Sequence, residues 1–158
     1  MNNQDILHLL LGDWQGMGKG EFPTIEPFEY LETISFSSDG RPFLHYDQKT
    51  RRRRAGQAEY APSHWENGFI RRLPDGQIEV TCAQNGGRLE MLHGSFEETE
   101  LGLILRLQST AFLNDPRMLE TSRTLILEGD TLHYTQTMHT TAVPASTHHV
   151  EARLKRVS

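Results

Sequence analysis

The chain has 158 residues, of which 36% are hydrophobic and 23% charged, a composition typical of a globular protein rather than a disordered or membrane-embedded one. Its length predicts one domain with a core of its own, and we assign residues 1–158 to it. Acidic residues number 21 against 16 Lys and Arg, so the formal net charge is −5. No overall positive field attracts nucleic acid or an anionic membrane, and neither is an expected partner.

The cysteine content and the first residues bear on the compartment. Cys82 is the single cysteine, which excludes an internal disulfide and fits a reducing environment. The first residues lack the basic start and apolar run of a signal peptide, and no apolar stretch approaches the roughly 20 residues that span a bilayer. We therefore expect a cytoplasmic protein.

The first predicted element is a short helix. Asp5 is a suitable N-cap, the apolar residues Ile6, Leu7 and Leu9 to Leu11 follow it, and Gly12 ends the turn. A helix this short is unstable alone, so we expect it to pack against a larger body.

The rest of the chain predicts strands at short, regular spacing. Apolar and polar residues alternate within them, and turns of the Asp-Gly and Asn-Gly kind supply the positive φ that tight hairpins need. In residues 29–36, Glu32 stands out of pattern on an otherwise apolar face. After a glycine-rich segment at residues 12–22, the predicted strands are 29–36, 42–48, 68–72, 78–84, 88–93, 103–108, 121–127, 132–139 and 149–157.

About ten short strands, joined mostly by hairpins and without helical crossovers, predict an all-β protein. The architecture that fits is an antiparallel up-and-down β-barrel with a short N-terminal helix. We expect the sheet to close, because open edges invite association. A closed barrel of this size has room for a ligand, so the pattern alone predicts a small-ligand carrier or a pocket enzyme.

The segment around residues 12–25 is the most distinctive. Gly16, Gly18 and Gly20 alternate with larger residues, which leaves one face of a strand without side chains. Such a face allows a bend packed by Trp14, close packing of the helix, or close approach of a flat ligand. It is not a phosphate loop, because no Gly-Lys-Ser/Thr follows and no helix begins there.

This glycine string is the first of several motifs that resemble the nitrobindin family, small haem-binding β-barrels related in shape to fatty-acid-binding proteins. The resemblance covers residues 10–156, and its motifs keep one order along the chain. They are Gly12-x-Trp14-x-Gly16-x-Gly18-x-Gly20-x-Phe22-Pro23-Thr24-Ile25, Pro27-Phe28-x-Tyr30, Gly40-x-Pro42-Phe43-Leu44-x-Tyr46-x-Gln48-x-Thr50, His64-x-Glu66-x-Gly68-Phe69-x-Arg71, Val80-x-x-Ala83-Gln84, Leu132-x-Tyr134-x-x-x-Met138 and His149-Val150-x-Ala152-x-Leu154.

The resemblance implies a ferric b-type haem in a shallow cleft at the mouth of the barrel. A histidine of the last strand, His149, would be the axial iron ligand. The resemblance also implies that Thr24 touches the haem and that His64 stands on the distal side as the catalytic group. Gln84 and Met138 would line the interior beside the cofactor.

The motifs leave two adjacent residues as candidates for the axial ligand. Counting forward from Met138 places the ligand at His148, whereas counting back from Leu154 places it at His149. The two histidines face opposite sides of a regular strand, so only one reaches the iron, and Glu151 would point the same way as His149. Strand register is tighter than loop length, which favours His149 and leaves His148 as the alternative.

The function implied by the resemblance is chemistry on reactive nitrogen species. Ferric haem would isomerise peroxynitrite to nitrate, ferrous haem would bind nitric oxide, and His64 would hydrogen-bond or protonate a bound oxyanion. A haem-free barrel that carries an apolar small molecule is the main rival. A closed barrel with a partner-binding surface is the third hypothesis, and a homodimer through edges or loops is compatible with all three.

Two other features are expected to have structural rather than functional roles. The arginine run at residues 51–54 is expected to cap a solvated hairpin, since a nucleic-acid site would want interleaved aromatics. Cys82 lies mid-strand, where a buried inert thiol is expected. No His-x-x-x-His or Cys-x-x-Cys spacing predicts a zinc site.

Overall fold

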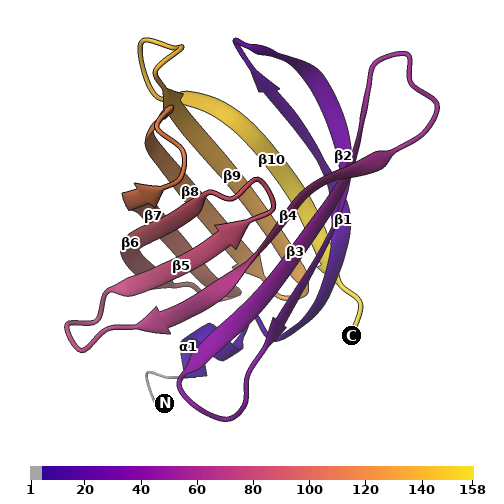
Figure 1. Ribbon diagram of the computed structural model, residues 1–158. Helices are drawn as coiled ribbons and strands as arrows, with labels where there is room; N and C mark the ends of the chain where they lie inside the picture. Colours follow the sequence, from indigo (N-terminus) through magenta and orange to yellow (C-terminus); the bar gives the residue numbers. More distant parts are fainter. Residues whose placement is uncertain (1–4) are drawn as a thin grey trace.

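The computed structural model describes residues 5–158, which form a closed barrel of ten antiparallel strands and one short helix (Figure 1). Each strand pairs with the next along the chain, and β1 pairs with β10 to close the sheet, which confirms the predicted up-and-down barrel. Residues 1–4 of the single-domain assignment lie outside the described residues. The elements are α1 (Asp5–His8), β1 (Gly12–Phe22), β2 (Ile25–Ser37), β3 (Phe43–Arg54), β4 (Ala61–Arg72), β5 (Ile78–Gln84), β6 (Leu89–Glu98), β7 (Gly102–Leu113), β8 (Met118–Glu128), β9 (Thr131–Thr140) and β10 (Thr147–Arg156).

The period-two alternation sends one side of each strand into the barrel. In β2, Tyr30, Glu32 and Ile34 are buried while the residues between them are exposed, so Glu32 belongs to the inner face despite its charge. Tight turns use glycine at positive φ, as at Gly76 (90°) and Gly129 (60°). Among the described residues, no helix is long and apolar enough to cross a bilayer.

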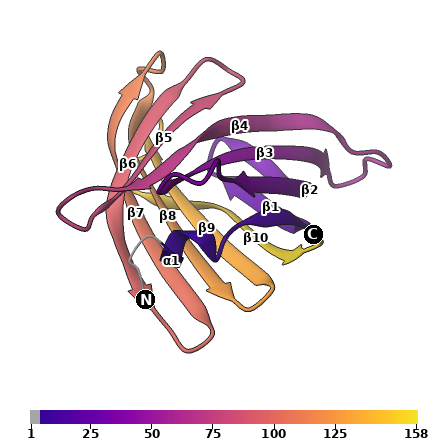
Figure 2. The same cartoon turned by 90° about the horizontal axis from the view of Figure 1, so that it is seen from below.

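One end of the barrel is closed by an apolar core. Helix α1 lies at the lower end in Figure 1 and across that end when the barrel is seen from below (Figure 2). Trp14 at the start of β1 is fully buried and donates its Nε1–H to the carbonyl of Leu10 at 2.9 Å, which fastens the segment after α1 to the sheet. Apolar side chains with no exposed surface make up the core: Leu10, Trp14, Leu44, Ile78, Leu92, Leu103, Leu105, Leu132 and Leu154.

The glycines of β1 make room for aromatic rings of β2. Gly18 pairs with Tyr30 and Gly20 with Phe28 across the two strands. A Cβ at Gly18 would lie 2.2 Å from the Tyr30 ring, and one at Gly20 would lie 2.3 Å from the Phe28 ring. Of the uses left open for the bare face, close approach is the one observed here, and the flat groups are the protein's own aromatic rings.

Candidate functional site

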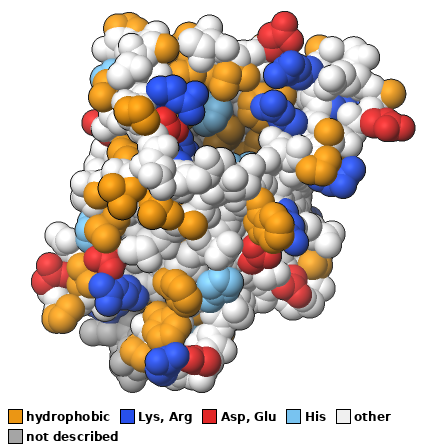
Figure 3. Space-filling view, in the orientation of Figure 1, with side chains coloured by type: hydrophobic (Ala, Val, Ile, Leu, Met, Phe, Trp, Pro, Cys, Tyr) orange, Lys and Arg blue, Asp and Glu red, His pale blue; other side chains and the backbone are white. Residues whose placement is uncertain are grey.

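The other end of the barrel opens into a cavity of about 620 Å³. The space-filling view shows the hollow, with Lys or Arg side chains at its edge (Figure 3). Four of the five predicted site residues line this cavity, namely His64, Gln84, Met138 and His149.

Thr24 is the predicted site residue that does not line the cavity. It is exposed in the turn between β1 and β2, and the cavity is lined instead by its neighbour Ile25. Thr24 therefore stands at the rim, one residue from the wall.

His149 is the extra residue of a β-bulge. In the pairing of β10 with β9, His148 lies opposite Thr137 and Val150 opposite Gln136, which leaves His149 without a counterpart. A bulge inserts one residue and re-aims a side chain. His149 is half-buried and lines the cavity, whereas His148 is exposed on the outer side of the barrel.

The bulge resolves the one-residue discrepancy between the two counts. The expectation that Glu151 follows His149 inward is wrong, because the bulge breaks the alternation at His149. Val150 lines the cavity beside it, while the Glu151 carboxylate meets Lys19 at 3.3 Å, outside. Val150, Ala152 and Leu154 therefore still face the interior of the barrel, and the bulge adds His149 to the same side.

The surroundings of His149 fix its tautomer. Its Nδ1 lies 3.1 Å from the carbonyl oxygen of Glu21, which can only accept, so Nδ1 carries the hydrogen and Nε2 keeps a lone pair. The rings of Phe22 and Phe28 stand edge-on to the imidazole, with centroids 5.5 and 6.4 Å away. Burial lowers the pKa of His149, and the bond to Glu21 opposes this only in part. The result is a neutral, oriented imidazole, the form that binds a metal.

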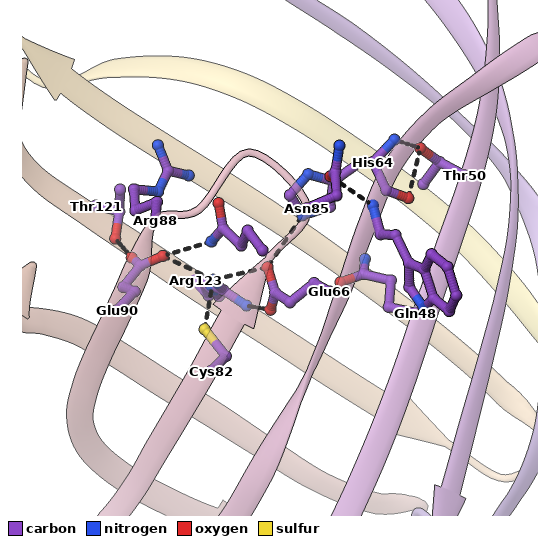
Figure 4. Close-up of polar contacts among 12 residues, drawn as sticks. Gln48, Thr50, His64, Glu66, Cys82, Asn85, Arg88, Glu90, Thr121 and Arg123 are labelled. Atoms are coloured by element: carbon purple, nitrogen blue, oxygen red, sulfur yellow. Dashed lines mark hydrogen bonds and ion pairs between the residues drawn. The ribbon is translucent and has the colours of Figure 1, made fainter. Parts of the chain in front are cut away.

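His64 approaches the same cavity from β4, well around the barrel from β10. Its Nε2 lies 3.0 Å from Oε1 of Glu66, and its backbone N–H donates to Oγ1 of Thr50 at 3.0 Å (Figure 4). The side chain is 37% exposed. Glu66 therefore holds the ring at the wall and leaves Nδ1 as the nitrogen available to a ligand.

Beneath His64 lies a buried ion network that the sequence analysis missed. Arg123 donates from Nη1 to Glu66 at 2.6 Å and from Nη2 to Glu90 at 3.0 Å (Figure 4). Tyr46 donates its hydroxyl to the same Glu66 oxygen at 2.5 Å. Burial alone would raise the pKa of Glu66, but Arg123 and His64 outweigh it and hold that pKa well below its ordinary value. Glu66 is therefore an ionised, paired carboxylate.

A second buried carboxylate, Glu32, has neutral partners. It accepts from Gln48 Nε2 at 2.6 Å and from the Tyr134 hydroxyl at 2.8 Å, both through Oε2. Its Oε1 is buried and without a hydrogen-bond partner among the described residues. Burial raises the pKa of Glu32 to about 7, although the bonds from Gln48 and Tyr134 lower it in part. This carboxyl changes charge near neutral pH.

Cys82 is buried and free, as expected. Burial raises the pKa of its thiol to about 11, so it stays protonated and unreactive at neutral pH.

The arginine run at residues 51–54 leads into the exposed turn of the β3–β4 hairpin, as expected, but it is strand rather than turn. It forms the end of β3, and alternation sends Arg52 toward the cavity, where its guanidinium lies 5.4 Å from the Phe28 ring centre. Arg53, on the other side of the strand, pairs with Glu29 at 3.3 Å. The run belongs to the strand because the pairing of β3 with β2 continues to Arg54.

The residues of the mouth fit a haem. A neutral imidazole offers a lone pair, apolar walls suit the porphyrin, and cations at the rim suit its carboxylates. Arg88 Nε is buried without a hydrogen-bond partner among the described residues, which leaves a donor for such a group. Within residues 5–158, no cluster of three His, Cys, Asp or Glu side chains is suited to a bare metal ion. The apolar walls include Ile25, Phe28, Met138 and Val150, and the cations are Arg52, Arg88 and Arg117.

A closed ten-stranded barrel with an oriented histidine facing a cavity at its mouth defines a class of ligand-binding β-barrel. Within that class, the chain belongs to the family of THAP4-like, heme-binding beta-barrel domains, whose family model matches residues 4–156. The resemblance drawn from the sequence motifs is thereby confirmed.

Curated relatives and solved structures agree with this assignment. The chain is 41% identical over 157 residues to "Peroxynitrite isomerase 2" of Mycobacterium marinum, covering 98% of this chain and 94% of the relative. It is 40% identical over 142 residues to "Peroxynitrite isomerase Rv2717c" of Arabidopsis thaliana, covering 90% and 82%. The crystal structure of Rv2717c from M. tuberculosis superposes with a TM-score of 0.89 at 32% identity, covering 100% and 99%. A phycobiliprotein lyase from Guillardia theta, at 8% identity and a TM-score of 0.64, shares the fold alone.

Proposed function

We propose that the chain binds haem b in the mouth cavity through His149 and acts as a peroxynitrite isomerase. The observation that carries the proposal is the free Nε2 lone pair of His149, aimed into the cavity by the bulge and fixed by the Glu21 carbonyl. The family assignment and the names of the relatives support it. Nitric oxide binding by the ferrous form and a cytoplasmic location belong to the same proposal.

Haem held by His149 would supply the iron chemistry for isomerising peroxynitrite to nitrate without net redox change. The chain supplies the surroundings. The Glu21 carbonyl keeps the His149 ring in one tautomer, and Phe22 and Phe28 shield the imidazole from water. His64, whose Nε2–H is held by Glu66, presents Nδ1 to the cavity, and with a proton on Nδ1 the ring would donate a hydrogen bond to a bound oxyanion.

The rival function, haem-free carriage of an apolar molecule, gains no support from the interior. The inner wall below the mouth carries Glu32, Glu66, Glu90 and Arg123, all buried. An apolar chain bound against these groups would desolvate their charges, and this desolvation costs free energy. A ligand with a polar edge and an apolar body fits this cavity better.

The proposal is tested by stopped-flow decay of peroxynitrite on haemin-loaded protein, with nitrate yield as a second readout. Wild type and His148→Ala are expected to accelerate the decay alike, whereas His149→Ala loses the acceleration. His64→Leu keeps the haem but slows the reaction by about a hundredfold, the lower end of the range for a general acid. Loss of activity in His148→Ala with His149→Ala intact contradicts the assignment.

A further inference from the structure

Two buried tyrosines and a carboxylate form a hydrogen-bonded row that the proposed chemistry does not use. The hydroxyl oxygens of Tyr30 and Tyr134 are 2.8 Å apart, and the Tyr134 hydroxyl lies 2.8 Å from Oε2 of Glu32. All three side chains are at most 5% exposed, and all line the cavity that His149 faces.

The row has an acceptor at each end. Tyr134 donates its hydroxyl hydrogen to Glu32, whereas the Tyr30 hydroxyl lies 2.8 Å from the Tyr134 oxygen and 3.2 Å from the backbone carbonyl oxygen of Glu151, either of which can accept its hydrogen. The hydrogen of Tyr134 therefore points to the carboxylate. Since Oε1 of Glu32 has no partner among the described residues, the ionised group keeps spare acceptor capacity.

We propose that Tyr134, backed by Tyr30 and Glu32, is a one-electron donor site that reduces radical oxidants in the cavity and is nitrated there. The oxidant class is nitrogen dioxide, a radical fragment of peroxynitrite. The inference rests on the proposed function only in taking peroxynitrite as the source of this radical. Tyr134 gives one electron to nitrogen dioxide, which becomes nitrite, and its hydroxyl proton passes to Glu32. A second nitrogen dioxide bonds to the ring carbon beside the oxygen of the tyrosyl radical. The hydrogen of that carbon returns to the oxygen, which yields 3-nitrotyrosine.

The proton acceptor decides whether the electron can leave. Burial and the nearby Glu32 raise the pKa of Tyr134 well above its ordinary value, so no phenolate is present. The phenol must therefore release its proton together with the electron. Glu32, with a pKa raised to about 7 by burial, is a base of suitable strength at the end of a formed hydrogen bond.

Aromatic contacts place the row close to the proposed iron ligand. The ring centre of Tyr30 is 6.0 Å from that of Phe28, which is 6.4 Å from that of His149. The bare positions Gly18 and Gly20 allow Tyr30 and Phe28 to occupy these places. An oxidant formed beside His149 would therefore be separated from Tyr30 by a single aromatic side chain, that of Phe28.

Tyr46 is a natural comparison inside the same barrel. It is 5% exposed, like Tyr134, and it also donates to a buried carboxylate, Glu66, at 2.5 Å. Glu66, however, is balanced by Arg123 and His64, which hold its pKa well below the ordinary value. Tyr46 thus has a hydrogen-bond acceptor without the proton affinity of Glu32.

The test uses haem-free protein exposed to nitrogen dioxide made by pulse radiolysis of nitrite. Tyrosyl radical is followed by absorbance, and nitration at the four tyrosines is mapped by peptide mass spectrometry. Nitration of Tyr134 is expected to exceed that of Tyr46 by about tenfold or more, the difference in proton affinity that one pKa unit represents. Because Tyr134 lines the cavity and Tyr46 does not, the variant at Glu32 is the arm that separates the proton acceptor from access. Glu32→Gln preserves shape and cavity access but cannot take the proton, so it should reduce Tyr134 nitration to the Tyr46 level.

Tyr134→Phe is the second variant, and it should also lower the radical yield because Tyr30 then loses its route to the carboxylate. Unchanged Tyr134 nitration in Glu32→Gln, with thermal unfolding confirming the fold, overturns the proposal. So does equal nitration of Tyr46 and Tyr134 in the wild type. Because the oxidant is delivered without haem, these outcomes are independent of whether the protein isomerises peroxynitrite.

Discussion

The two ends of the barrel use the same strands for opposite purposes. On β2 the inner face changes from Tyr30 and Glu32 on the mouth side to Ile34 and Phe36 at the closed end. The closed end is apolar, with Trp14 fully buried against the segment after α1. Alternation decides which side chains enter the barrel, and position along the strand decides whether they are apolar or charged. Stability is therefore concentrated at one end and chemistry at the other.

Removing the largest side chain of the closed end should have the largest effect. Trp14→Ala leaves a cavity in a core without slack and should lower the free energy of unfolding by about 3–5 kcal/mol. Trp65→Ala is the matched control, because Trp65 is 51% exposed and loses only a hydrogen bond to Asp47 and a contact with Lys49, so it should cost about 1 kcal/mol. Urea unfolding measures both, and equal midpoints for the two variants would contradict the division between the ends.

The pH dependence of stability probes the mouth side. The pKa of Glu32 is raised to about 7 in the folded chain from an ordinary value of 4.5, so its contribution is present below pH 4.5 and lost as pH rises through 7. The loss should be about 3 kcal/mol, at 1.36 kcal/mol per pKa unit. Urea unfolding of wild type and Glu32→Gln at pH 4.5 and pH 8 measures it. The variant should gain stability relative to wild type as pH rises, and a constant difference would refute the raised pKa.

The bare face of β1 offers a smaller test. Gly18→Ala places a methyl group 2.2 Å from the Tyr30 ring and should cost about 1–3 kcal/mol as the ring moves. Gly86→Ala is the control, since its Cβ meets nothing within 4 Å. Thermal unfolding gives the stability, and near-ultraviolet circular dichroism reports the tyrosine environment. Equal tolerance at both positions would mean that Tyr30 does not depend on the missing side chain.

The local sequence pattern predicted the fold well, because strands, turns and the short helix each depend on residues that are close together in the sequence. Alternation also placed Glu32 on an inner face, although its partners could not be foreseen. Tyr30 and Tyr134 are 104 positions apart, and Glu66 and Arg123 are 57 apart. Such pairs depend on barrel register, which single-strand patterns do not contain.

The site was predicted in outline through family motifs, and its decisive detail appeared only as a mismatch. Two ways of counting gave His148 and His149, and the bulge at His149 explains why both counts were reasonable. The strict alternation that placed Glu151 inward failed because a bulge interrupts the period of two. A one-residue disagreement between loop and strand counts is thus a usable signal for a bulge.

The most direct test of the account is a haemin titration followed in the Soret region on wild type, His149→Ala and His148→Ala. The account predicts saturable one-to-one binding in wild type and His148→Ala, and its loss in His149→Ala with the barrel still folded. Loss in His148→Ala alone, or no binding in wild type, would contradict the assignment of His149 as the ligand at the barrel mouth.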